Sequence, residues 1–134
     1  MSLYFLDSNI IMYTLGNPHP LKIPCTKIIE KIRSAKIQVC TDTEVFQEIL
    51  YRYYSIGRKD IAHQACELLG DIATPIFPVS HEDIVKAMSL LNSHVIPVRD
   101  AIHAATMMNH NIRYILSSDT HFDHIPEIKR LQPG

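Results

Sequence analysis

Short, continuous apolar runs alternate along this chain with longer segments in which apolar residues recur every three or four positions. Uninterrupted apolar runs of about four residues are typical of strands buried on both faces of a parallel sheet. We therefore predict strands at Leu3–Leu6, Ile37–Cys40, Pro75–Pro78, Arg113–Leu116 and Ile128–Leu131.

The segments between these runs carry helical periodicity and helix-start signals. Thr41 and Glu44 have the spacing of a capping box, which predicts Thr41 as the cap of the helix that follows. The proline-rich stretch through Pro18, Pro20 and Pro24 predicts an irregular loop. One expected helix is opened by the Thr41 cap, has Val45, Phe46, Ile49 and Leu50 on one face and runs to about 54. The others are one that continues through 10–13, one through Ile28, Ile29 and Ile32 to about 34, one from about 60 to 69, one capped by Ser80 with Ile84, Val85, Met88 and Leu91 inward, and one from 100 to about 108.

Strands that alternate with helices predict an α/β fold, with a mostly parallel sheet covered by helices on both faces. No linker and no internal repeat divides the 134 residues, so we expect a single domain over 1–134. The composition, 46% apolar and 20% charged, is that of a globular protein.

Bulk charge and cysteine content narrow the function only slightly. A formal net charge of −1 leaves no footprint of a general nucleic-acid binder. Three widely spaced cysteines indicate buried thiols in a reducing compartment. No apolar run is long enough to cross a membrane and no signal-peptide pattern opens the chain, so we expect a cytoplasmic protein with no membrane partner.

Acidic residues recur where the predicted strands end and helices begin. Asp7 follows the first strand, Asp119 follows the fourth, Glu48 lies in the helix after the second, and Asp100 opens its own helix. Ligands of parallel α/β sheets bind beyond the carboxyl ends of the strands. We therefore expect these four acids to converge on one rim of the sheet.

Each acid taken singly also has an ordinary structural explanation. Asp7 could cap its helix, Asp100 could favour the helix dipole, Asp119 could be a turn residue, and Glu48 could be a solvated helix position. Those explanations do not predict a shared rim. Carboxylates that meet repel one another, and a hard cation such as Mg²⁺ or Mn²⁺ relieves that repulsion.

Histidines offer a rival metal site. Asp119, His121, Asp123 and His124 could hold Zn²⁺ or a redox metal, although the two histidines lack a clear scaffold and a surface position is the simpler interpretation. His103 lies one turn along from Asp100, where it could line the pocket or bind a carboxylate.

Four segments of this chain resemble the PIN domain family of metal-dependent nucleases, which includes the VapC-type toxins. They are LDSNI at Leu6–Ile10, EIL at Glu48–Leu50, RDAIHAAT at Arg99–Thr106 and LSSDTHFD at Leu116–Asp123. The resemblance implies a three-layer α/β/α sandwich with about five strands, an Mg²⁺ or Mn²⁺ cofactor, and hydrolysis of RNA phosphodiester bonds.

The resemblance also implies roles for individual residues. The acidic set falls on Asp7, Glu48, Asp100 and Asp119, with Asp123 as a frequent fifth member. We expect Asp7, Asp100 and Asp119 to bind metal directly and Glu48 and Asp123 to act through water. Asn9 matches a residue that orders the carboxylates, and Ser118 takes the hydroxyl position beside the strand-end acid. Basic residues that grip RNA do not transfer; our candidates are Arg52, Arg58, Lys59 and Arg99.

A toxin of this family would be held inactive by an antitoxin protein whose Arg or Lys enters the acidic pocket. Homodimerisation is also expected, with Tyr51, Tyr53 and Tyr54 either at the interface or over the domain's own core. Two alternatives remain open. One is a non-catalytic RNA- or protein-binding module that retains the acidic pocket. The other is a phosphatase or phosphoryl-accepting regulator, although LDSNI lacks the Asp-x-Asp arrangement typical of one such group.

Overall fold

Five parallel strands form the centre of the computed structural model, which describes residues 2–133. Their order in the sheet is β3-β2-β1-β4-β5, and every adjacent pair is parallel. The predicted α/β fold with about five strands is therefore confirmed. The strands are β1 (Leu3–Leu6), β2 (Gln38–Asp42), β3 (Ala73–Phe77), β4 (Tyr114–Leu116) and β5 (Lys129–Leu131).

The first strand occupies the middle of the sheet because its residues can be buried on both faces. Phe5 pairs in register with Cys40 on one side and with Ile115 on the other, and all three are fully buried. Pro75 lies in β3, an edge strand, where a residue without an N–H is tolerated.

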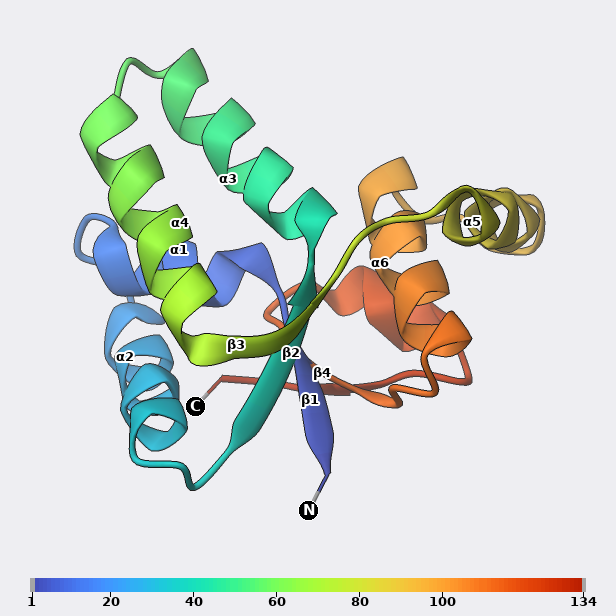
Figure 1. The fold of residues 1–134 in the computed structure, drawn as a ribbon, viewed down its shortest axis with the longest axis horizontal. Coiled ribbons are helices and arrows are strands. Elements are labelled where there is room, and N and C mark those ends of the chain that lie inside the picture. The colour runs from blue at the N-terminus through green and yellow to red at the C-terminus, as the bar shows by residue number, and fades with distance from the viewer. Residues whose placement is uncertain (1, 134) are drawn as a thin grey trace.

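Helices cover both faces of the sheet and complete the three-layer sandwich (Figure 1). In this view the first four helices lie to the left of the central strands and the last two to the right, while α3 contacts α6 across the top. The helices are α1 (Ser8–Leu15), α2 (Lys22–Arg33), α3 (Thr43–Ser55), α4 (Lys59–Ile72), α5 (His81–Ser93) and α6 (Val98–Asn109), and a 3₁₀ turn, η1, spans Thr120–His124. None of these helices, within residues 2–133, is long and apolar enough to cross a bilayer.

The predicted inward face of α5 is wrong for three of its four residues. Ile84, Val85 and Met88 are 37%, 52% and 60% exposed, whereas Leu91 is partly buried against the core. The helix is rotated because Asp83 is buried: its carboxylate completes a capping box with Ser80 and accepts a 2.8 Å hydrogen bond from Asn109 of α6. A buried carboxylate needs these partners, so they fix which face of α5 meets the protein.

The predicted start of α3 is also wrong. β2 continues through Asp42, and the Asp42 side chain, not that of Thr41, caps the helix by accepting from Val45 N at 2.9 Å. Thr41 belongs to the strand, where its hydroxyl donates to the Leu6 carbonyl at 3.2 Å. The extension brings one more acid to the carboxyl end of the sheet. Pro24, expected in a loop, lies in the first turn of α2, where its missing N–H costs nothing.

Candidate metal centre

Asp7 lies where the central strand gives way to α1, and it is almost completely buried. Its Oδ1 accepts the Ser8 N–H at 2.8 Å, so the carboxylate does cap the helix. Its Oδ2 accepts from the Ser117 hydroxyl at 2.6 Å and from the Asn9 amide at 3.1 Å. Burial raises the pKa of Asp7 despite the lowering effect of His103 and Ser117.

Asn9 and Ser117 tie this carboxylate to the end of β4. The Asn9 amide also donates to Ser117 Oγ at 3.1 Å, and its Oδ1 accepts the Ser118 N–H at 3.1 Å. Ser117 Oγ in turn accepts the Asp119 N–H at 2.9 Å. The expected hydroxyl therefore comes from Ser117, and Ser118 contributes through its backbone. This network fixes the positions of Asp7 and Asp119 relative to each other.

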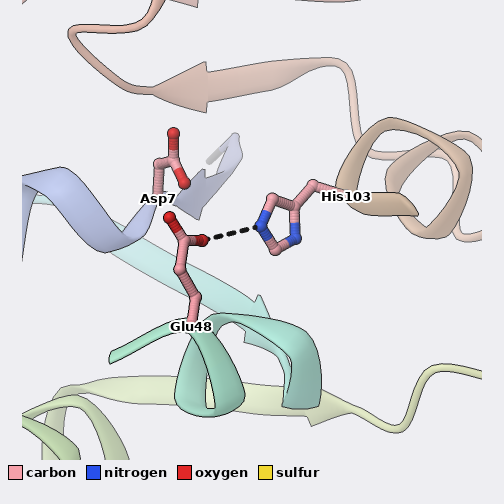
Figure 2. Close-up of side chains that lie close together, drawn as sticks. All are labelled: Asp7, Glu48 and His103. Carbon is pink, nitrogen blue, oxygen red and sulfur yellow. Dashed lines mark hydrogen bonds and ion pairs between the residues drawn. The ribbon is translucent and has the colours of Figure 1, made fainter. Parts of the chain in front are cut away.

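Glu48 reaches the same rim from α3, and Figure 2 shows its carboxylate, Asp7 and the His103 ring pointing toward one another. Glu48 Oε1 lies 3.4 Å from His103 Nε2, and its Oε2 lies 3.9 Å from Arg99 Nη1. Burial alone would raise the pKa of Glu48, but the contacts with His103 and Arg99 outweigh it and lower that pKa.

Asp100 and Asp119 form a second acidic group with His121. One ligand atom from each of these three residues lies within 4.8 Å of the others, and the same holds for Asp7, Glu48 and His103. His121 Nδ1 lies 2.6 Å from Asp119 Oδ1 and 3.5 Å from Asp100 Oδ2. The two groups are close enough for the charge of Asp7 to contribute to the raised pKa of Asp100.

The donor set fits a hard divalent cation. Among residues 2–133, Asp100 Oδ2 is the one buried side-chain oxygen or nitrogen without a hydrogen-bond partner. Burial and the adjacent Asp119 raise the pKa of Asp100 to about 8. Burial opposes ionisation of Asp119 as well, but Asp100 and His121 lower its pKa. Without a cation this pair therefore retains a proton near neutral pH, and an oxygen-preferring cation is the natural replacement.

Other sequence-predicted residues have different surroundings. The Asp123 carboxylate is bound by the Arg130 guanidinium through two 3.0 Å hydrogen bonds, so it is already neutralised and lies outside both acidic groups. Arg99 contacts Glu44 at 3.5 Å as well as Glu48, and Arg58 pairs with Asp60.

A cleft of about 560 Å³ opens beside the acids. Asn9, Glu48 and Arg99 form its border with the acidic rim, and Tyr51, Arg52 and Arg58 lie farther along it. Tyr51 is 64% exposed, whereas Tyr53, expected either at an interface or over the core, is buried in the core.

Sequence reasoning missed Asp42 and Ser117 and left His103 and His121 without defined roles. Asp42 carried a usable signal, since an acid at the carboxyl end of a buried strand, just before a helix, resembles the arrangement of Asp7 between β1 and α1. The role of Asp42 was missed because the capping-box spacing favoured Thr41 as the helix cap. Ser117 and Ser118 are adjacent and chemically identical, so only the direction in which each side chain points tells them apart.

Comparison with known proteins agrees with this geometry. The PIN domain family matches residues 4–128. VapC ribonuclease Mb1869c of Mycobacterium bovis is 36% identical over 127 residues, covering 94% of this chain and 97% of the relative. Ribonuclease VapC23 of Mycobacterium tuberculosis is 30% identical over 116 residues, covering 86% and 91%.

Solved structures share the fold at lower identity. VapBC2 from Rickettsia felis, bound to a promoter DNA fragment, superposes with a TM-score of 0.74 at 17% identity over 97% of this chain and 98% of that one. VapC20 of Mycobacterium tuberculosis, a toxin that cleaves the sarcin-ricin loop, superposes with a TM-score of 0.72 at 16% identity over 91% and 93%. The family match over nearly the whole chain, together with these relatives, shows that the chain belongs to the PIN domain family.

Proposed function

We propose that this chain is a divalent-metal-dependent endoribonuclease and the toxin of a toxin–antitoxin pair. The observation that carries the proposal is the buried, unpartnered Asp100 oxygen beside Asp119, in a rim that also holds Asp7 and Glu48. Relatives at 36% and 30% identity bear the name ribonuclease, which supports RNA as the substrate.

The residues divide the work at the site. Asp7, Asp100 and Asp119 would hold Mg²⁺ or Mn²⁺, which when bound neutralises phosphate charge and lowers the pKa of water. Asn9 and Ser117 keep Asp7 in place through their hydrogen bonds to its Oδ2. Glu48 borders both the acids and the cleft, so it is placed to orient the attacking water against the scissile phosphate.

The cleft beside Glu48 is where we place the RNA strand. Unpaired bases bind by stacking on aromatic side chains, and phosphates bind to arginine. Tyr51 supplies an exposed ring, and Arg52 lies next to it on the same cleft. Since RNA is the proposed substrate, we place the protein in the cytoplasm; the free cysteines Cys25, Cys40 and Cys66 agree with a reducing compartment.

The proposed antitoxin would bind the same acidic rim. One structure that shares this fold is a toxin–antitoxin complex from Klebsiella pneumoniae, and another is a member of the VapBC family of toxin–antitoxin systems from Mycobacterium tuberculosis. An arginine or lysine of such a partner would neutralise Asp100 and Asp119 in the way that Arg130 neutralises Asp123.

We also propose that the protein forms a homodimer through α5. Ile84, Val85 and Met88 expose a continuous apolar stripe on this helix. A twofold axis lets such a stripe bury itself against its own copy, which is the commonest symmetry of small oligomers.

Asp7→Asn and Asp100→Asn should each reduce RNA cleavage by at least ~100-fold, because each removes a few kcal/mol of charge stabilisation at the cation. The measurement is cleavage of a mixed RNA pool with Mn²⁺, alongside calorimetry of Mn²⁺ binding. Asp123→Asn is the matched control and should retain most of the activity, since Arg130 already occupies that carboxylate.

Wild-type cleavage by Asp7→Asn and Asp100→Asn would show that the site is assigned wrongly. Wild-type protein that binds Mn²⁺ but cleaves no RNA would favour the non-catalytic binding module. Release of phosphate from small phosphoesters would favour a phosphatase.

Asp100→Asn should also change how stability depends on pH in metal-free protein. The folded pKa of Asp100, about 8, lies above its unfolded value of 3.8, so this residue costs increasing stability as pH rises through that window. The melting temperature of the variant should therefore gain on wild type between about pH 5 and pH 8. Mn²⁺ should reverse the order by stabilising only wild type. Parallel melting curves across this range would contradict the electrostatic account.

Tyr51→Ala should weaken RNA binding roughly tenfold, mostly as a higher KM, because one stacked base contributes ~1–3 kcal/mol. Tyr54→Ala is the control: Tyr54 is also exposed on α3 but lies outside the cleft and bonds to His63 at 2.7 Å. Equal kcat and KM values for the two variants would show that the RNA strand does not bind in this cleft.

Val85→Asp should convert the homodimer to a monomer, because it places a charge in the centre of the apolar stripe. Sedimentation velocity measures the change, with Lys27→Asp on α2 as a surface control. A wild-type protein that sediments as a monomer, or a dimer that survives Val85→Asp, would count against this interface.

A further inference from the structure

The His103 ring lies buried between two carboxylates that belong to different elements. Its Nδ1 is 2.9 Å from Asp42 Oδ2 at the end of β2, and its Nε2 is 3.4 Å from Glu48 Oε1 on α3. The side chains of His103 and Asp42 are both fully buried. Each ring nitrogen thus faces a carboxylate oxygen.

Asp42 is held rigidly on the far side of the ring. Its Oδ1 accepts the Val45 N–H at 2.9 Å and its Oδ2 meets His103, so both oxygens are engaged. The Phe5 ring packs against the imidazole with centroids 5.5 Å apart. This packing removes water from the ring and leaves it one orientation, toward Glu48.

Glu48 needs such support because it is a flexible side chain at a partly open position. Its side chain is 22% exposed, and apart from His103 its partners are Arg99, 3.9 Å from Oε2, and the side chain of Ser8. A glutamate held so loosely would lose rotamer freedom each time the site had to form. The hydrogen bond with His103 fixes Oε1 beforehand and leaves the other carboxylate oxygen on the side of Asp7 (Figure 2).

The same geometry argues against His103 as a metal ligand, although it lies within ligand distance of Asp7 and Glu48. A ligand nitrogen must offer a lone pair to the metal. Here Nδ1 is directed at Asp42 and Nε2 at Glu48. Both nitrogens are used to hold carboxylates.

We propose that Asp42 and His103 are positioning residues that hold the Glu48 carboxylate at the metal centre without touching the metal or the RNA. This inference rests on the proposed metal-dependent activity. Residues that orient metal-site carboxylates from behind change metal affinity or activity by about 10–100-fold when they are removed.

Two substitutions at one position separate positioning from packing. The Gln side-chain amide extends to the position of Nε2 and can still donate to Glu48, whereas the shorter Asn amide matches Nδ1 and reaches only Asp42. His103→Gln should therefore retain Mn²⁺ affinity and kcat within a few-fold of wild type. His103→Asn should lose at least ~10-fold in Mn²⁺ affinity or kcat, although its melting temperature should fall by about as much as that of His103→Gln.

Asp42→Asn provides a second measurement, because an Asn Oδ1 can still cap α3 through Val45 N. We expect it to weaken Mn²⁺ binding about as much as His103→Asn does. His110→Asn, at the C-cap of the same helix, is the control: His110 stacks on Phe77 and should change stability alone.

Mn²⁺ calorimetry, kcat and KM, and electron spin-echo spectra of the Mn²⁺-loaded protein distinguish the outcomes. Equal Mn²⁺ affinity and kcat in wild type, His103→Asn and Asp42→Asn would overturn the inference. The inference would also be overturned if a nitrogen coupling to Mn²⁺ were present in His121→Gln and absent in His103→Gln, because that result would show that His103 binds the metal. Wild-type protein that binds no Mn²⁺ would overturn the proposed function itself, and the positioning role with it.

Discussion

Repulsion among carboxylates at one edge of the sheet is the constraint on which the rest of this structure depends. Asp7, Asp42, Glu48, Asp100 and Asp119 all reach the rim formed by the carboxyl ends of the central strands. Ionised carboxylates in a partly buried site need cationic or hydrogen-bonding partners. The partner that neutralises each carboxylate distinguishes the acids that support the site from those that remain available to bind a cation.

The protein satisfies the acids in two ways. Asp42 and Glu48 share the buried imidazole of His103. Burial alone would lower the pKa of His103, but these carboxylates outweigh it. The pKa of His103 therefore lies well above its ordinary value. Asp100 and Asp119 have no buried counter-ion of this kind and depend on a shared proton, on the half-exposed His121, or on a cation. The second pair is therefore the part of the rim that would hold the proposed metal, and the first pair would support it.

The rim has consequences for the surfaces around it. Glu48 belongs both to the acidic group and to the cleft that carries Tyr51 and Arg52, so metal and RNA would meet at one side chain. The apolar stripe lies on α5, whose buried face packs against α6 and is bound to it by the hydrogen bond between Asp83 and Asn109. The proposed catalysis and the proposed self-association would therefore draw on different elements of the chain.

By itself the sequence determined the strand order along the chain, the parallel α/β architecture and the acids that end β1 and β4, because buried strands and helix starts are encoded in local patterns. Tertiary structure alone decided which face of α5 is buried, which of two adjacent serines binds Asp7, and which acids His103 neutralises. These outcomes depend on contacts between residues as far apart in the chain as Asp42 and His103, and no local periodicity reports the direction of a side chain toward a partner 61 positions away.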